Sequence, residues 1–209
     1  MITPTLLALR DFSRIREIMT ILAKYGLGEF VQRIKLSHEG LSVEEAEIDP
    51  NSRYMSTPRR FRLAFEELGP TFVKLGQILS TRVDIFNLEW IEEFEQLQCN
   101  VKPIVSADIN QLIEAQLGQP VGNVFKYIDA TPIGSASIAQ VHKAELISGE
   151  TVAVKIKRPN IDPTIHADLR ILTHLAGLIE SEIPESRRYQ PVQMVQYFAR
   201  SLAKETDLS

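Results

Sequence analysis

The chain has 209 residues, of which 44% are hydrophobic and 24% are charged. This is the usage of an ordinary globular protein, and it excludes a disordered, collagen-like or disulfide-rich chain. The 23 Lys and Arg residues are outnumbered by 27 Asp and Glu residues, which gives a formal net charge of −4. Binding of nucleic acid through bulk positive charge is therefore excluded, and no nucleic-acid partner is expected.

The sequence also argues against disulfides, zinc and a membrane span. Cys99 is the single cysteine, so no disulfide can form within the chain, and the histidines have no cysteine partners at zinc-ligand spacing. No metal-ligand set is predicted. Arg10 and Asp11 interrupt the first apolar run, so no signal peptide is predicted. No run approaches the roughly 18 uncharged apolar residues of a spanning helix. We expect these residues to be soluble, or at most peripheral on a membrane.

The first part of the chain has a helical hydrophobic pattern. Apolar residues recur at three- and four-residue spacing over residues 9–33, and an acidic, polar stretch at 38–50 is typical of a linker. A second helical block covers residues 58–117, with predicted breaks at Gly69-Pro70, near Asn87 and around Lys102-Pro103.

The pattern changes its period in the second part. Residues 124–128, 138–146 and 150–156 have the β-branched residues and partial alternation of strands, and Ser148-Gly149 predicts a hairpin between the last two. Helical spacing returns over residues 161–180 and again from residue 191. The predicted class is α+β, with three segments: N-terminal helices and an acidic linker (1–50), a helical extension (51–120), and a small antiparallel sheet with packed helices (121–209).

Four arginines follow the acidic linker with no acidic residue among them. They are Arg53, Arg59, Arg60 and Arg62. The interpretation that we favour is a solvated surface that neutralises nearby acids. The alternative is a basic patch that faces phosphates or lipid head groups.

The residues that point most directly to chemistry lie between 131 and 157. Gly134, Ser135, Ala136 and Ser137 are small enough to let the backbone approach a ligand closely. A strand, a hairpin and a Val-Ala-Val-Lys strand that ends on Lys155 follow. This is the order of the nucleotide lobe of protein kinases, in which a loop covers the ATP phosphates and the strand lysine contacts them. Each part alone is a weak signal.

Two further polar groups stand out at helical positions. Lys74 and Gln77 are three residues apart and project from one helix face, with an unusual glycine between them. Glu205 and Asp207 lie near the end of the chain and do not share a helix face well. Spacing alone favours a solvated surface for both groups.

Three motifs in one collinear order resemble the UbiB family of atypical protein-kinase-like proteins. The first is Leu68-Gly-Pro-Thr-Phe-Val-Lys-Leu-Gly-Gln-Ile-Leu-Ser-Thr-Arg82. The second is Pro132-Ile-Gly-Ser-Ala-Ser-Ile-Ala-Gln-Val-His-Lys-Ala144, and the third is Val152-Ala-Val-Lys-Ile-Lys-Arg-Pro159. The resemblance covers most of the chain and implies that residues 121–209 form a protein-kinase-like N-lobe, truncated and without its C-lobe.

The resemblance also assigns roles to residues. Lys74 and Gln77 match the Lys-x-Gly-Gln helix, which folds over the nucleotide site, and Glu205 and Asp207 match the Glu-x-Asp motif that interacts with it. Residues 134–137 match the alanine-rich loop, and Lys155 is the strand lysine. The implied cofactors are ATP and Mg²⁺, the implied activity is ATP hydrolysis or phosphotransfer, and the implied process is the synthesis of ubiquinone and related prenyl lipids.

The sequence departs from the family in two respects. The loop reads Gly-Ser-Ala-Ser where many members have three alanines before the serine, which puts loop stiffness and nucleotide preference in doubt. The family's catalytic loop and metal-binding Asp-Phe-Gly-type segment are absent, so we expect the chain to be an N-terminal portion that is inactive alone. For the full-length bacterial protein the resemblance implies the cytoplasmic side of the inner membrane.

Two hypotheses of different classes follow. The first is the N-terminal part of a kinase-like ATPase that binds Mg-ATP and supports ubiquinone biosynthesis. The second is a non-catalytic scaffold or lipid chaperone, on which prenyl-lipid intermediates or enzymes of the pathway dock. His142 lies within a predicted strand, and for it we expect a buried, hydrogen-bonded role rather than that of a general base.

Overall fold

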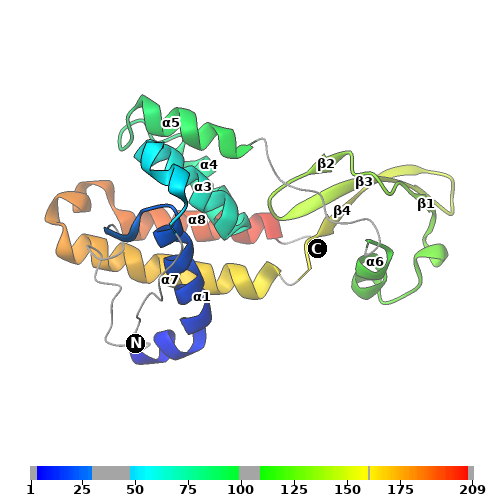
Figure 1. Ribbon diagram of the computed structural model, residues 1–209. Helices are drawn as coiled ribbons and strands as arrows, with labels where there is room; N and C mark the ends of the chain where they lie inside the picture. The colour runs from blue at the N-terminus through cyan, green and yellow to red at the C-terminus, as the bar shows by residue number, and fades with distance from the viewer. Residues whose placement is uncertain (1–3, 30–47, 99–108, 160, 207–209) are drawn as a thin grey trace. The chain divides into compact units, whose positions relative to one another are not determined.

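The computed structural model describes residues 4–29, 48–98, 109–159 and 161–206 (Figure 1). By its internal contacts the chain forms two compact units. The helical unit contains residues 1–99 and 163–203, and the sheet unit contains residues 100–162 and 204–209. The chain therefore leaves the helical unit, builds the sheet unit and then returns.

The helical unit contains α1 (Pro4–Lys24), α3 (Thr57–Leu68), α4 (Pro70–Leu79) and α5 (Leu88–Glu95) from the first pass of the chain. The return pass supplies most of α7 (Ile161–Glu182) and of α8 (Pro191–Thr206). Short 3-10 helices cover Pro50–Tyr54, Gln96–Gln98 and Pro184–Tyr189.

The predicted helix breaks at Gly69-Pro70 and near Asn87 are confirmed, while the one predicted around Lys102-Pro103 lies outside the described residues. Gly69 separates α3 from α4 with φ of 96°, a left-handed backbone conformation that glycine adopts without strain. Pro70 then begins α4, where its missing N–H would have no partner within the helix. The Asn87 side chain accepts a hydrogen bond from the Trp90 N–H and so caps the start of α5.

Aromatic rings form much of the core between α3, α4 and α5. Phe65 and Phe94 stack with an interplanar angle of 5° and ring centroids 5.6 Å apart. Phe86 and Trp90 lie against Phe94 in edge contacts, at centroid distances of 5.7 and 5.6 Å. These rings bury a large apolar area and favour one packing geometry, so they fix how the three short helices pack.

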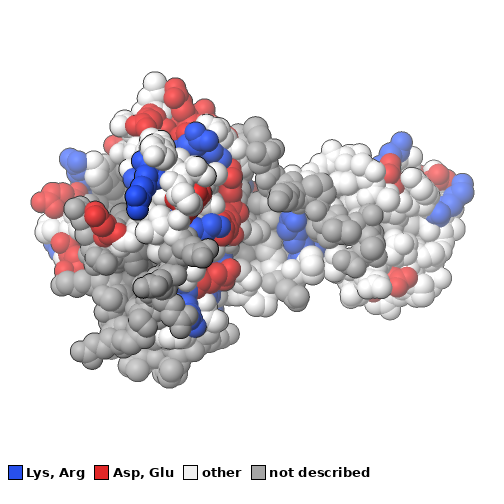
Figure 2. Space-filling model, in the orientation of Figure 1, with Lys and Arg blue, Asp and Glu red and all other residues white. Residues whose placement is uncertain are grey.

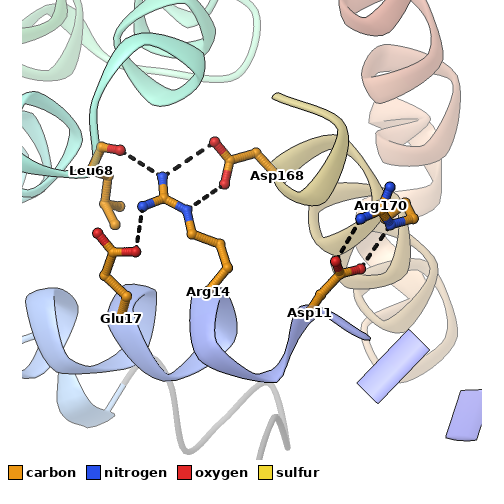
Figure 3. A network of polar contacts seen from close by, with 6 residues as sticks. All are labelled: Asp11, Arg14, Glu17, Leu68, Asp168 and Arg170. Carbon is orange, nitrogen blue, oxygen red and sulfur yellow. Dashed lines mark hydrogen bonds and ion pairs between the residues drawn. The ribbon is translucent and has the colours of Figure 1, made fainter. Parts of the chain in front are cut away.

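Two ion pairs of opposite polarity join α1 to α7 (Figure 3). Arg14 on α1 holds both carboxylate oxygens of the buried Asp168 on α7, at 2.7 and 3.2 Å. Asp11 on α1 accepts two hydrogen bonds from Arg170 on α7, at 2.7 and 2.5 Å. The Arg14 guanidinium also donates to the Leu68 carbonyl oxygen at the end of α3, at 2.6 Å. One guanidinium therefore ties three helices together.

The sheet unit contains four antiparallel strands around a central β3. The strands are β1 (Phe125–Ile128), β2 (Gly134–Ser135), β3 (Ala139–Leu146) and β4 (Thr151–Lys157). β4 pairs with β3 along nearly its whole length, whereas β1 and β2 each pair with one part of it. The predicted α+β class is confirmed. The short strand β2, which the sequence did not predict, adds to the three predicted strands.

One face of this sheet packs on α6 (Ile109–Leu117). The core there contains Ile109 and Ile113 of the helix, together with Ala144 and Ile156 of the sheet. His142 lies on the same face of β3 and is 0% exposed. Its Nδ1 lies 2.7 Å from the Asp129 carbonyl oxygen, and its Nε2 lies 3.2 Å from the Gln140 amide nitrogen. Since a carbonyl oxygen only accepts, Nδ1 is the donor in this hydrogen bond, and the predicted buried, hydrogen-bonded position of His142 is confirmed.

We expect Asp168→Ala to destabilise the protein by about 3–5 kcal/mol, because it leaves the Arg14 guanidinium without its buried carboxylate partner. Burial raises the pKa of the Asp168 carboxyl, and the hydrogen bond from Arg14 opposes that shift. The measurement is the free energy of unfolding in urea. The matched control is Lys24→Ala, which removes the exposed Lys24–Glu67 pair and should cost at most about 1 kcal/mol. Equal losses for the two variants would contradict the prediction.

Candidate functional site

The strand register places Lys155 and Gly134 on one row of the sheet. Val141 on β3 pairs with Lys155 on β4, and the same Val141 pairs with Gly134 on β2. Residues that pair directly across antiparallel strands share a face of the sheet. Ile156, the neighbour of Lys155, is buried in the core with α6, so the Lys155 side chain projects from the opposite face, where it is exposed.

The position of Gly134 leaves open space beside its backbone. A Cβ atom built there would meet no heavy atom within 4 Å. Packing therefore does not require a glycine at this position. The glycine leaves a stretch of main chain that carries no side chain. This stretch lies two strands away from Lys155, on the same face of the sheet. A phosphate group can approach such a backbone closely and be neutralised by the lysine.

The four small residues 134–137 do not form one loop. The first two belong to a strand, and the last two belong to a tight turn. Gly134 and Ser135 make up β2, and the Ala136 N–H donates to the Ala139 carbonyl oxygen at 2.8 Å. This bond closes a two-residue turn at Ser137-Ile138, whose two residues are both buried. The predicted loop at 134–137 is therefore shorter and more constrained than its composition suggested.

Arg158, which the sequence reasoning did not single out, holds this turn. Its guanidinium donates to the Ser135 hydroxyl oxygen at 3.2 Å and to the Ala136 carbonyl oxygen at 3.3 Å. Its backbone N–H donates to the Ile138 carbonyl oxygen at 3.0 Å. Burial lowers the pKa of the guanidinium. In the sequence Arg158 is part of the motif Val152–Pro159, but that motif assigned a role only to Lys155.

Glu205 lies beside Lys155 within the sheet unit. The Lys155 ammonium donates to the Glu205 backbone carbonyl oxygen at 3.4 Å, in the last described turn of α8. Carbonyl oxygens at a helix C-terminus carry partial negative charge and favour a cation. Asp207 lies outside the described residues.

Lys74 and Gln77 belong to the helical unit. Both lie on α4, and Gln77 donates from its amide to the Leu97 carbonyl oxygen at 3.4 Å. The glycine between them is explained by packing, because a Cβ on Gly76 would collide with the Leu97 side chain and lie 3.1 Å from the Phe65 ring.

The arginine cluster is partly used for internal contacts. Arg62 forms ion pairs with Glu66 and Glu93 at 2.6 and 2.7 Å. Arg60 donates to the Gly26 carbonyl oxygen at 3.1 Å. On the face drawn in Figure 2, acidic and basic side chains are interspersed over the helical unit. The ion pairs of Arg62 support the locally neutralised surface for one of the four arginines, while Arg60 is engaged by a backbone oxygen.

The described residues contain neither a metal-ligand cluster nor a membrane-spanning helix. No group of three or more His, Cys, Asp or Glu side chains among them could hold a metal ion. No helix in the described part of the chain is both long and apolar enough to cross a bilayer.

The small antiparallel sheet with a strand lysine is consistent with the N-lobe of a kinase-like protein. A family model described as ABC1 atypical kinase-like domain matches residues 96–209. The chain therefore belongs to this family, and the resemblance to UbiB proteins is confirmed.

Similar proteins include a "Probable protein kinase UbiB" of Aliivibrio salmonicida, 36% identical over 95% of this chain, and one of Shewanella loihica, 43% identical over 71% of it. An "Uncharacterized protein in hydrogenase 1 5'region" of Clostridium pasteurianum is 42% identical over 83% of the chain. The matches cover 37%, 27% and 30% of the lengths of these relatives, in the order given.

Gly76→Ala should destabilise the helical unit by about 1–3 kcal/mol, because the added methyl group overpacks the contact with Leu97. The gain in helix propensity, about 1 kcal/mol, offsets part of this cost. Thermal unfolding of the single variant and of Gly76→Ala combined with Leu97→Ala tests the cause. We expect the double variant to lose less stability than the sum of the two single variants. Strict additivity would show that the two side chains do not compete for the same space.

Proposed function

We propose that this chain is the N-terminal part of a UbiB-type kinase-like ATPase that binds Mg-ATP and supports ubiquinone biosynthesis. The observation that carries the proposal is the row formed by Gly134, Val141 and Lys155. It sets an exposed ammonium and an open stretch of backbone on the same face of a small sheet. Membership in the ABC1 atypical kinase-like family supports the same reading.

In this proposal Lys155 contacts the phosphates of the nucleotide. An ammonium group has three N–H donors, so the contact with the Glu205 carbonyl oxygen leaves two for phosphate oxygens. The turn at 136–139 borders the phosphates and limits the access of water. In this proposal Mg²⁺ is bound together with the nucleotide phosphates, as in other kinase-like proteins.

The remaining roles follow from the family resemblance. Lys74 and Gln77 on α4, together with Glu205 and Asp207, are proposed to gate the nucleotide site. The complete protein would act at the cytoplasmic side of the inner membrane, where prenyl-lipid intermediates and the enzymes of the pathway are its proposed partners. The proposed activity of the complete protein is transfer of the γ-phosphate of ATP to water or to another acceptor.

We expect Lys155→Ala in the complete protein to weaken Mg-ATP binding by about tenfold or more, the effect of losing a charge-assisted hydrogen bond to phosphate. Isothermal titration of the nucleotide into the protein measures the dissociation constant. Lys126→Ala is the matched control, because Lys126 is an exposed lysine of the same sheet that pairs with Glu145. Unchanged affinity in Lys155→Ala would overturn the assignment of the site.

The scaffold or lipid-chaperone function remains a second candidate, resting on the exposed Arg53 and Arg59 of the arginine cluster. It differs from the first in its dependence on nucleotide. For the ATPase proposal, binding of the complete protein to vesicles that contain a prenyl quinone should change when Mg-ATP is added. Vesicle binding that is indifferent to Mg-ATP but falls in an Arg53→Ala, Arg59→Ala double variant would favour the scaffold.

A further inference from the structure

Arg158 makes three separate contacts with the turn between β2 and β3. Its guanidinium reaches the Ser135 hydroxyl and the Ala136 carbonyl oxygen, and its backbone N–H reaches the Ile138 carbonyl oxygen. The contacts join Arg158, which follows β4, to residues that lie 20 to 23 positions earlier in the sequence. They therefore fasten the turn to the end of the strand that carries Lys155.

Several polar groups of the turn take their hydrogen-bond partner from Arg158. Within the turn the Ala136 N–H donates to the Ala139 carbonyl oxygen, while the carbonyl oxygens of Ala136 and Ile138 accept from Arg158. Ser137, Ile138 and Ala139 are buried, so packing holds the tip of the turn, whereas the Ser135–Ala136 side of the turn is held by the Arg158 guanidinium. β2 is only two residues long, and such a short strand pairing is weak by itself.

We propose that Arg158 is a positioning residue that fixes the turn at residues 136–139 relative to Lys155, and that it thereby sets the affinity for the phosphates of the nucleotide. The inference rests on the proposed nucleotide site and adds to it a residue that acts through the turn. Arg158 lies three residues after Lys155, so it ties the turn to the strand that carries the lysine. A movement of the turn relative to that strand would change the space between Gly134 and Lys155.

An arginine suits this role better than a lysine. Its planar guanidinium donates from Nη2 to the Ser135 hydroxyl oxygen and from Nε to the Ala136 carbonyl oxygen, so two nitrogens in a fixed geometry serve the two acceptors. A lysine at this position keeps the positive charge but presents a single nitrogen, so it can hold one of the two acceptors well. The charge and the bridging geometry can therefore be separated by substitution.

The test uses Arg158→Ala, Arg158→Lys and Ser135→Ala in the complete protein, with Lys126→Ala as the charge-matched control. The dissociation constants for Mg-ATP and for adenosine, which lacks phosphates, are measured for each. We expect Arg158→Ala to weaken Mg-ATP binding about tenfold, as for a lost hydrogen bond from a charged donor. Arg158→Lys and Ser135→Ala should lie between this value and the wild type. Adenosine affinity should stay unchanged throughout.

A double variant separates positioning from direct contact with phosphate. If Arg158 acts through the turn, adding Ser135→Ala to Arg158→Ala should weaken Mg-ATP binding no further than Arg158→Ala alone. If Arg158 binds phosphate itself, the two losses should multiply, which would overturn the proposal. An equal loss of affinity for adenosine and Mg-ATP would indicate a general loss of structure and would also overturn it.

Hydrogen exchange of the nucleotide-free protein gives an answer that does not depend on nucleotide binding. The peptide that covers residues 133–139 should exchange about tenfold faster in Arg158→Ala than in the wild type, with Arg158→Lys between them. Exchange equal to the wild type would overturn the proposal even if Arg158→Ala weakened nucleotide binding.

The failure of the nucleotide site and the failure of the Arg158 role can be told apart. If Lys155→Ala leaves Mg-ATP affinity unchanged, the proposed nucleotide site is wrong. If Lys155→Ala weakens it and Arg158→Ala does not, only the role of Arg158 fails.

Discussion

The paired charges between α1 and α7 are the constraint on which the helical unit depends. Arg14 and Asp168 are 154 residues apart in the sequence, and Asp11 and Arg170 are 159 apart. These contacts join the first pass of the chain to the second, so the sheet unit is built by a segment whose two ends are both anchored. Because Asp168 is 0% exposed, a mismatch there leaves a buried charge without compensation. The two reciprocal pairs therefore specify which faces of α1 and α7 meet.

Within the sheet unit, the central strand β3 is the element that constrains the positions of the others. It pairs with every other strand, so its register decides which residues of β2 and β4 share a row. A slip of one residue would turn Lys155 into the core and Ile156 out of it. The apolar contacts of Ile156 with α6 oppose that slip. The packing on one face therefore holds the lysine in place on the other, and Arg158 adds a local contact that holds the facing turn.

Much of this could be predicted from the residues alone. Gly69-Pro70 and Asn87 mark helix ends because their backbone and side-chain chemistry acts locally. The Ser148-Gly149 hairpin is set by the φ of 91° that Gly149 adopts. The buried role of His142 was predicted from its place in a strand, and the family from three collinear motifs. The strand β2 was not predicted, since Gly134 and Ser135 have little preference for a strand and become one only by pairing with β3.

The sequence by itself determined the helices, three of the strands, the family and the identity of the strand lysine. These depend on patterns a few residues long, in which neighbours along the chain act on one another. Only the tertiary structure decided that α7 returns to α1, that Gly134 and Lys155 share a row, and that Arg158 fastens the turn. Each of these joins residues that are distant in the sequence, through a register or a bidentate contact. No local sequence pattern indicates which distant residues pair, because the same arginine or glycine could form many other pairings equally well.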